Sequence, residues 1–425
     1  MATPLYLGID FGTSGCRAIA IDNAGSSLAE AHVSMPAPLH QGEHGLQQDP
    51  EVWWHALQQA LQTLSHQIDL SHCSRLAVDG TSATLLLTDA RGKPLTPAWM
   101  YNDARSRDAA QLITAHTPAD HAAHGPTSSL AKCLTLQHQV PTARHALHQC
   151  DWILGRLANR FDLSDENNAL KLGYDPLQRQ WPDWLSDLAL DRSLLPHVQP
   201  AGAEIGLIDP RIAAELGLPD SITLVSGTTD STAAVLASGA SRNGDAVTSL
   251  GSTLVMKILS DQPIFDARCG LYSQRLGNFW LVGGASSSGG RVLLQHFTLQ
   301  QLDEMTQTLQ PDQPTGLDYY PLPATGERFP YADPDMQSRV TPRPGQDVVF
   351  FQALLEGMAA IEAQAYRAME KAGTPAPSRV ISIGGGAANH AWCAIRARQL
   401  DVPVEPARHM QAAYGTALLA AGQIP

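Results

Sequence analysis

Two short turns that combine glycine with hydroxyl side chains are the segments of this chain best suited to chemistry. They consist of Gly12, Thr13 and Ser14 in the first half and Gly251, Ser252 and Thr253 in the second half. Each turn lies between two apolar runs, which predicts a β-hairpin whose glycines let backbone N–H groups approach an anion. Either turn alone could be only a tight hairpin. The pair favours a polyphosphate held between two lobes, and hence a nucleotide-dependent enzyme.

One carboxylate, Asp230, stands where a predicted strand leads into a predicted helix. Residues 222–226 are typical of a strand, and they lead through the small residues 227–229 into Asp230. We therefore expect Asp230 to project from a turn into the cleft between the lobes, where a carboxylate can accept the proton of a substrate hydroxyl. The alternative is that Asp230 only caps the helix that follows it.

A run of three glycines in the second half is the third candidate segment. The candidate contacts of an adenosine are Gly384, Gly385, Gly386, Asn389 and Trp392. The glycines follow a β-branched run and let the chain pass close to a ligand, the asparagine could form a hydrogen bond, and the tryptophan could pack near the base. Neither the dinucleotide fingerprint Gly-x-Gly-x-x-Gly nor a Gly-x-x-x-x-Gly-Lys-Ser/Thr phosphate loop occurs here, which argues against a nicotinamide enzyme.

The elements around these segments alternate as in an α/β protein. After the first hairpin, Asp49 and Pro50 begin a predicted helix, in which apolar residues recur every three or four positions from Trp54 to Ile68. A strand is predicted at residues 75–78. This order of hairpin, helix and strand predicts an α/β domain.

The second half repeats that scheme, which suggests a distant internal duplication. A hairpin begins at residue 246, helical patterns lie near 288–309 and 347–373, and a strand is predicted at 379–383. The proline-rich stretch 311–345 is long and irregular, and we expect it to form a surface excursion.

Composition excludes several classes of protein. The chain has 425 residues and a net charge of −13, so we expect no nucleic-acid partner and no anionic-membrane partner. We expect neither a membrane helix nor a signal peptide, because no apolar run approaches roughly 18 residues and no basic segment precedes the first hairpin. The six scattered cysteines predict free thiols in a cytoplasmic protein. We interpret the pairs His121/His124 and His145/His148 as surface residues rather than a zinc site.

The order of the motifs along the chain resembles that of a known family. Residues 7–14, 227–230, 250–253 and 384–386 together resemble the FGGY carbohydrate kinases, and the resemblance extends over nearly the whole chain. It implies an α/β fold of two ribonuclease H-like lobes, as in the actin/hexokinase superfamily, with an interlobe cleft.

The resemblance also implies that the two lobes bind different ligands. Residues 1–228 would form the N-terminal sugar-binding lobe and residues 229–425 the C-terminal nucleotide-binding lobe. A C-terminal helix near 410–425 would pack back on the first lobe.

The same resemblance assigns roles to the candidate residues. Both turns and the glycine triplet, with Asn389 and Trp392, would bind ATP. Asp10 would face the sugar and hold Mg²⁺ through water, because that ion keeps much of its hydration. Asp230 would contact the substrate and act as the catalytic base.

The sugar pocket is expected in the first lobe. Thr81, Ser82 and Asp103 are further substrate-binding candidates, although Asp103 could equally form a surface ion pair with Arg105. This chain has Asp-Gly-Thr-Ser at residues 79–82. In the corresponding segment, glycerol kinases have a sequence that resembles Ser-Asn-Gln-Arg-Glu, and xylulose kinases have Gly-Gln-Met-His-Gly.

This difference favours D-ribulose over glycerol and D-xylulose, and it favours the compact, D-ribulokinase-like (pentulose kinase) branch of the family. The expected reaction converts D-ribulose and ATP to D-ribulose 5-phosphate and ADP. The alternatives are a D-xylulose or other polyol kinase of the same family, or a catalytically weak nucleotide-binding sensor. The expected partners are the sugar and ATP, with the protein a monomer or homodimer.

Overall fold

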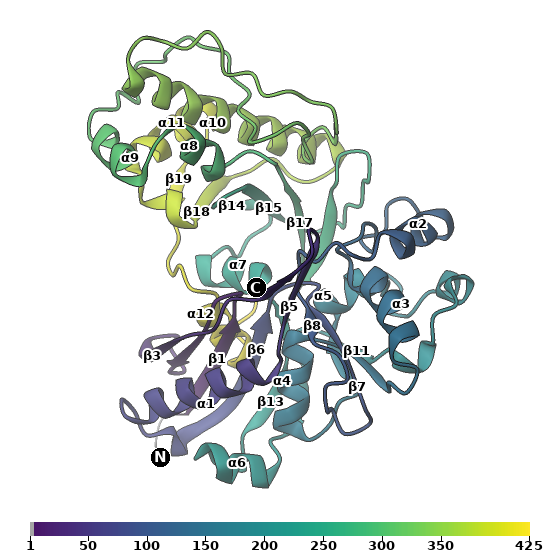
Figure 1. The fold of residues 1–425 in the computed structure, drawn as a ribbon. Coiled ribbons are helices and arrows are strands. Elements are labelled where there is room, and N and C mark those ends of the chain that lie inside the picture. Colours follow the sequence, from purple (N-terminus) through teal and green to yellow (C-terminus); the bar gives the residue numbers. More distant parts are fainter. Residues whose placement is uncertain (1–3) are drawn as a thin grey trace. The chain divides into compact units, whose positions relative to one another are not determined.

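The computed structural model describes residues 4–425 and divides into two compact units. The first runs to Ala237 and also contains Gln274–Gly277 and Gln411–Ile424, and the second contains Ser238–Ser273 and Asn278–Met410. The division falls within α7 (Asp230–Ser238), later than the boundary that we placed after residue 228. The last helix, α12 (Ala412–Ala420), belongs to the first unit (Figure 1).

A six-stranded sheet forms the centre of the first unit, in the order β12-β13-β6-β1-β2-β3. Its strands are β1 (Leu5–Phe11), β2 (Gly15–Ile21), β3 (Ser27–Ser34), β6 (Cys73–Gly80), β12 (Glu204–Leu207) and β13 (Thr223–Thr229). β1 and β2 form the predicted antiparallel hairpin, whereas β6 runs parallel to both β1 and β13. The carboxyl ends of β1, β6 and β13 therefore meet at one edge, where ligands bind in open α/β sheets.

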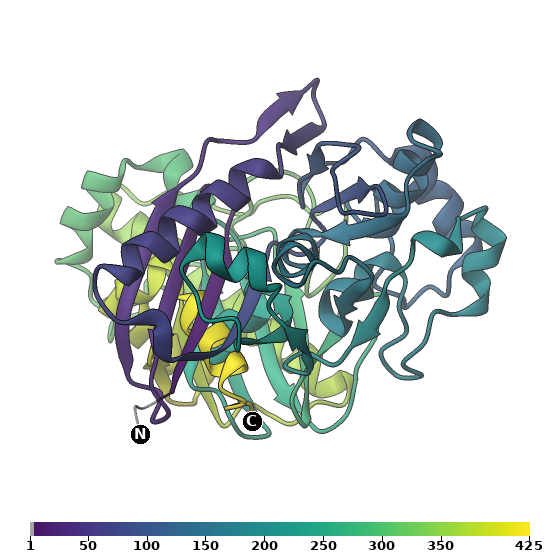
Figure 2. The same cartoon turned by 90° about the horizontal axis from the view of Figure 1, so that it is seen from below.

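Alternate residues of β1 face two different layers, as the period of a strand requires. Leu7 and Ile9 belong to the core that includes α1 (Glu51–Ser65), which lies across the strands β1–β3 (Figure 2). Gly8 faces the other layer, where a Cβ would collide with the backbone of α12 at Ala417. The close approach of α12 to β1 therefore depends on a glycine at this position.

The rest of the first unit is a smaller sheet with helices around it. That sheet has the order β4-β5-β8-β7-β9, with β4 (Leu39–Gln41), β5 (Gly45–Gln48), β7 (Leu85–Thr88), β8 (Ala98–Trp99) and β9 (His145–His148). The helices are α2 (Arg107–His116), α3 (Ser129–Gln139), α4 (Gln149–Ala158), α5 (Glu166–Ala169) and α6 (Pro210–Leu216). A short parallel pair is formed by β10 (Leu163–Asp165) and β11 (His197–Gln199).

The sheet of the second unit repeats the pattern, with strands in the order β17-β15-β14-β18-β19. Its strands are β14 (Asp245–Leu250), β15 (Leu254–Ser260), β17 (Phe279–Ala285), β18 (Arg379–Ile383) and β19 (Val404–Pro406), and β16 (Tyr272–Leu276) precedes β17. β14 and β15 form the second predicted hairpin, and β18 runs parallel to β14 as β6 does to β1. The helices are α8 (Gly290–His296), α9 (Leu299–Thr306), α10 (Asp347–Ala372) and α11 (His390–Leu400).

α10 is the central helix of the second core. Among the described residues it is the one helix long and apolar enough to cross a membrane, by length and composition only. Most of it is covered within its own unit, however, and Phe350, Leu354 and Met358 are almost completely buried. Its apolar composition is thus accounted for by its place in the core.

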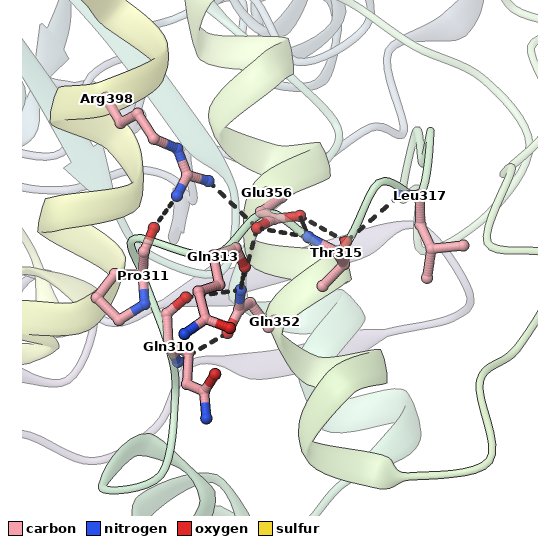
Figure 3. A network of polar contacts seen from close by, with 8 residues as sticks. All are labelled: Gln310, Pro311, Gln313, Thr315, Leu317, Gln352, Glu356 and Arg398. Carbon is pink, nitrogen blue, oxygen red and sulfur yellow. Dashed lines mark hydrogen bonds and ion pairs between the residues drawn. The ribbon is translucent and has the colours of Figure 1, made fainter.

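The proline-rich stretch 311–345 is irregular, but it is anchored to the helices. Figure 3 shows the carboxylate of Glu356 on α10 accepting hydrogen bonds from the Thr315 N–H (3.1 Å) and hydroxyl (2.5 Å) and from Arg398 Nη2 (3.2 Å). Further along, Glu327 of the same stretch is buried. The prediction of a surface excursion is therefore wrong for the part of the stretch that enters the core.

The side chains of one histidine pair also differ from expectation. His148, at the end of β9, is completely buried, with its Nδ1 2.7 Å from Asp151 Oδ2 and its Nε2 3.0 Å from Ser129 Oγ. Its interpretation as a surface residue is wrong, because the strand that carries it ends inside the first unit. All six cysteines have free thiols, as predicted.

Candidate functional site

The candidate residues fall into two groups, one in each unit. The first unit carries Asp10, Gly12, Thr13, Ser14, Thr81, Ser82, Asp103 and Asp230, and the second carries Gly251, Ser252, Thr253, Gly384, Gly385, Gly386, Asn389 and Trp392.

Three carboxylates gather at the carboxyl edge of the sheet in the first unit. Asp10 near the end of β1 lies in register with Asp79 near the end of β6, and Asp79 is in register with Thr228, shortly before Asp230. Asp10 and Asp79 are both buried, and the Thr416 hydroxyl of α12 donates a hydrogen bond to Asp79 Oδ2. The parallel pairing of the strands thus brings together two sequence-predicted residues, with Asp79 between them.

Burial penalises the ionised form of a carboxylate, and it raises the pKa of both Asp10 and Asp79. Burial raises the pKa of Asp79 well above its usual range, and the neighbouring charges of Asp10 and Asp230 raise it further. Burial also raises the pKa of Asp10, while the hydrogen bond from Asp79 and the charge of Arg17 oppose that rise. An oxygen of Asp10 lies 3.7 Å from Arg17, so a positive charge lowers the pKa of Asp10, whereas the charges that act on the pKa of Asp79 are the negative ones of Asp10 and Asp230.

Asp230 stands at the junction of β13 and α7. It is the first helical residue, and its Oδ1 accepts a hydrogen bond from the Ser231 N–H at 2.6 Å. An N-cap side chain instead lies one residue before the helix and binds the N–H groups two or three residues further on. Asp230 thus stands at the carboxyl end of β13 and at the first position of α7, and its carboxylate is half-buried.

The first glycine-hydroxyl turn joins β1 to β2 immediately after the edge that carries Asp10. Its backbone closes with a hydrogen bond from the Gly12 N–H to the Gly15 carbonyl (3.0 Å), and the Ser14 carbonyl accepts the Met35 N–H (2.8 Å). Ser14 is exposed, and Gly12 is half-buried. The turn is thus a fixed, accessible loop of backbone and hydroxyl donors close to Asp10 in the chain.

The turn at residues 81–84 is held from behind by buried groups. Thr81 donates to Gln149 Oε1 through its N–H (3.0 Å) and its hydroxyl (2.9 Å), and its hydroxyl lies 2.6 Å from that of Thr84. Lys132 Nζ donates to the carbonyls of Ala83 and Met100, each at 2.7 Å, and burial lowers the pKa of Lys132 to about 7. Ser82, between these anchors, is half-buried.

Asp103 forms the ion pair with Arg105 that the sequence left open as the alternative to a sugar contact. Its side chain is completely buried and forms an ion pair with Arg105 (2.7 Å), and its Oδ2 also accepts the Leu46 N–H (2.8 Å). The guanidinium of Arg105 in turn lies 3.9 Å above the ring of Trp99. Because protein groups already engage the carboxylate of Asp103, its contacts argue for a role in shaping this loop.

A cavity of about 700 Å³ lies in the second unit. Its apolar lining includes Leu250, Leu293, Leu302, Phe351, Leu355 and Trp392, and its polar lining includes Ser252, Asp303, Thr306, Gln307 and Asn389. A mainly apolar pocket of this size with a few polar groups is typical of a small-molecule site.

Two of the sequence-predicted segments line this one cavity. The second glycine-hydroxyl turn contributes Gly251 and Ser252, and the glycine triplet contributes Gly385 and Gly386. Gly384, which directly follows β18, has a φ of +84°, in the left-handed region that favours glycine.

The two side chains expected near a nucleoside have distinct environments in the cavity wall. Asn389 caps α11 by accepting the Trp392 N–H (2.9 Å), and its Nδ2 donates to Thr306 Oγ1 (3.1 Å). The ring of Trp392 is buried, and its Nε1 has no hydrogen-bond partner. The asparagine thus builds the wall, and among the described residues the indole N–H is a buried donor whose hydrogen bond is not satisfied.

Several residues of both groups escaped sequence reasoning. The sequence indicates Asp79 only as part of a sugar-pocket segment, although this residue occupies the same strand-end position as Asp10. That parallel was the one available signal. The cavity residues on α9 and α10, such as Thr306 and Phe351, carry no motif at all.

One further group of metal-binding residue types occurs among the described residues. The ligand atoms of Cys150, Asp151 and Asp165 lie within 4.8 Å of one another, and all three residues are buried. Asp165 caps α5, and Asp151 forms a capping box with His148 at the start of α4. These oxygens are thus engaged in helix caps.

Comparison with known proteins finds the two domains of one family in consecutive parts of the chain. The N-terminal domain of the FGGY family of carbohydrate kinases matches residues 5–237, and its C-terminal domain matches residues 246–423. The xylulose kinase of Escherichia coli (strain K12) is 27% identical to this chain, in an alignment that covers 93% of the chain and 86% of that protein.

Solved structures of sugar kinases share the fold. A xyloylose kinase from Brucella ovis has a TM-score of 0.90 at 24% identity, with 99% of this chain and 91% of that chain covered. A gluconate kinase from Lactobacillus acidophilus has a TM-score of 0.86 at 19% identity, with 99% and 89% covered. These likenesses confirm the predicted two-domain α/β fold, and the matches to both family domains establish the family. The chain belongs to the FGGY family of carbohydrate kinases.

Proposed function

We propose that this chain transfers the terminal phosphate of ATP to a hydroxyl of a pentulose. The observation that carries the proposal is the pair of built sites: a carboxylate cluster at a strand edge in the first unit, and a nucleoside-sized cavity with a glycine-hydroxyl turn in the second. Phosphoryl transfer requires these parts, since its catalysis is mostly positioning and charge stabilisation.

The residues of the cavity fit the nucleoside part of ATP. Leucine, phenylalanine and tryptophan side chains offer an apolar wall, and the indole N–H of Trp392 is a buried donor without a partner. The backbone can come close to a ligand at Gly385, where an added Cβ would meet no protein atom within 4 Å. Ser252, with its neighbours Gly251 and Thr253, would hold the phosphate chain through hydroxyl and backbone donors.

The carboxylate cluster fits a divalent cation. Asp10 has the acceptor oxygens that Mg²⁺ prefers, and a cation would offset the repulsion among the carboxylates of Asp10, Asp79 and Asp230. Bound there through water, Mg²⁺ would neutralise charge on the phosphate oxygens. Asp230 would accept the proton of the attacking hydroxyl, whose oxygen forms a bond to phosphorus as the bond to ADP breaks.

We propose D-xylulose as the acceptor, because relatives that align along most of the chain are xylulose kinases. This choice replaces D-ribulose, which the sequence alone favoured. D-Ribulose stays the second candidate, since residues 79–82 read Asp-Gly-Thr-Ser instead of the xylulose kinase pattern.

A panel of acceptors decides between these sugars. With coupled detection of ADP, we expect kcat/KM for D-xylulose to exceed that for glycerol, gluconate and hexuloses by at least about tenfold, the effect of one or two misplaced polar contacts. Faster turnover of D-ribulose than of D-xylulose would transfer the assignment to D-ribulose. Faster turnover of glycerol or gluconate than of either pentulose would contradict the proposal.

Gly385→Ala tests the nucleotide site without disturbing the fold. Because its Cβ has open space within the protein, we expect an unchanged melting temperature but a KM for ATP raised about tenfold or more, through overlap with the nucleotide. Gly345→Ala is the matched control, since that glycine also has open space but does not line the cavity. Equal KM values for ATP in both variants would remove Gly385 from the site.

A further inference from the structure

The second glycine-hydroxyl turn packs against a loop, and residues of the proline-rich stretch hold this loop in place. Residues 286–290 comprise the connection from β17 to α8 and the first residue of α8, and they pair with both sides of the turn. The Ser286 N–H donates to the Leu254 carbonyl (2.9 Å), and the Leu254 N–H donates to the Ser288 carbonyl (2.8 Å). The Gly290 N–H donates to the Gly251 carbonyl (2.9 Å). The position of the turn therefore depends on the position of this loop.

The contact between the loop and the turn leaves no free space. A Cβ on Gly289 would come within 2.6 Å of the Thr253 Cα, and a Cβ on Gly290 within 2.9 Å of the Gly251 carbonyl oxygen. Packing this close transmits a shift of the loop directly to the backbone of the turn.

The carboxylate of Glu327 holds the other side of that loop. Its Oε2 accepts hydrogen bonds from the hydroxyls of Ser286 (2.7 Å) and Tyr320 (2.8 Å). Its Oε1 accepts the N–H groups of Ser287 (2.6 Å) and Arg328 (2.8 Å). Glu327 is 3% exposed, and four donors converge on it, so the loop has no comparable partner if the carboxylate is removed.

The side chain of the next residue, Arg328, also binds the loop. Arg328 Nη2 donates to the Ser286 carbonyl at 2.8 Å, and the Ser288 N–H donates to the Ser286 hydroxyl at 3.0 Å. Two consecutive residues of the proline-rich stretch, Glu327 and Arg328, thus both form hydrogen bonds with Ser286 of the loop.

We propose that Glu327 is a positioning residue for the phosphates of the nucleotide, acting through residues 286–290 on the turn at Gly251, Ser252 and Thr253. The proposal rests on the nucleotide site proposed above. It gives the proline-rich stretch a function, because this stretch supplies the buried carboxylate. The turn and Gly290 form only part of the cavity lining, and α9, α10 and α11 supply much of the rest. The contacts of a nucleoside with these three helices should therefore depend less on Glu327 than the contacts of the phosphates with the turn.

Binding measurements on three ligands separate these contributions. In Glu327→Ala, we expect the Kd of ATP and of ADP to rise by about tenfold or more, the loss of roughly one hydrogen bond, while the Kd of adenosine changes less than about threefold. Glu327→Gln should restore ATP binding to within about threefold of the original chain, because its amide oxygen can accept both N–H groups and its NH₂ can donate to the two hydroxyls.

Glu356→Ala is the matched control. Glu356 is also a buried carboxylate of the second unit that fastens the proline-rich stretch, but its partners are Thr315, Gln352 and Arg398 (Figure 3). We expect this variant to change the Kd values of ATP and adenosine by the same small factor. If Glu327→Ala does not fold, Tyr320→Phe, which removes a single donor, should still weaken ATP more than adenosine.

Two results would overturn the proposal. One is an unchanged Kd of ATP in Glu327→Ala, and the other is an equal loss for ATP and adenosine, which indicates a merely structural residue. Failure of the proposed function is a separate result, since it would show as absence of ATP binding or of acceptor-dependent ADP release in the unsubstituted chain.

Discussion

Asp230→Asn is expected to lower kcat by about 10²–10⁴-fold, the usual contribution of a positioned general base. The asparagine cannot accept the proton of the acceptor hydroxyl, although it keeps nearly the same shape. The Kd of ATP should change less than about threefold, because the nucleoside cavity lies in the second unit and Asp230 in the first. Initial rates and equilibrium nucleotide binding measure the two effects.

Asp209→Asn is the control for the alternative that Asp230 merely caps a helix. Asp209 is the N-cap of α6 and accepts the N–H groups of Arg211 (2.9 Å) and Ile212 (3.4 Å). Asparagine is an equally good N-cap, so this variant should keep its activity. If Asp230→Asn is as active as Asp209→Asn, Asp230 is not the base.

Arg396→Met is expected to destabilise the second unit by about 3–5 kcal/mol, the usual cost of leaving a buried charge unpaired. Arg396 and Glu362 are both almost completely buried and form two hydrogen bonds with each other, of 2.6 and 2.7 Å. Arg396 Nη1 also donates to Ser382 Oγ on β18, and the Thr248 hydroxyl on β14 donates to Glu362. The pair thus joins two neighbouring strands to α10 and α11.

Native-state hydrogen exchange is the suitable measurement, because a protein of two units need not unfold in one step. The free energy of opening should fall at amides of β14 and β18. Arg339→Met is the control: its ion pair with Asp318 is exposed, so its loss should cost at most about 1 kcal/mol. A similar small loss for Arg396→Met would show that the buried pair adds little to the stability of the unit.

Local patterns in the sequence were sufficient for the parts of the fold that depend on neighbours in the chain. The apolar runs on each side of a glycine turn predicted both hairpins, β1–β2 and β14–β15, and they form as expected. The period of three and four from Trp54 onward predicted α1 for the same reason. Turn chemistry and side-chain periodicity act over a few residues, so a single sequence displays them.

The candidate site depends on contacts that no local pattern contains. Asp79 joins Asp10 and Asp230 only because β6 pairs in parallel with its two neighbours, and this register is set by the whole sheet. For Asp103 the sequence left a sugar contact and an ion pair with Arg105 both open. The ion pair forms, but it is buried rather than at the surface, because the fold of the whole unit decides burial. Glu327 lies in a segment that sequence reasoning left on the surface.

Acceptor-dependent release of ADP tests the kinase assignment most directly. At saturating ATP and Mg²⁺, we expect D-xylulose or D-ribulose to raise the rate of ADP release by at least about 100-fold above the rate without sugar. Without the sugar, the remaining acceptor is water, and a sugar kinase transfers phosphate to water only slowly. A slow rate that no pentulose, hexulose or polyol alters would contradict the account, and it would indicate a nucleotide-binding sensor.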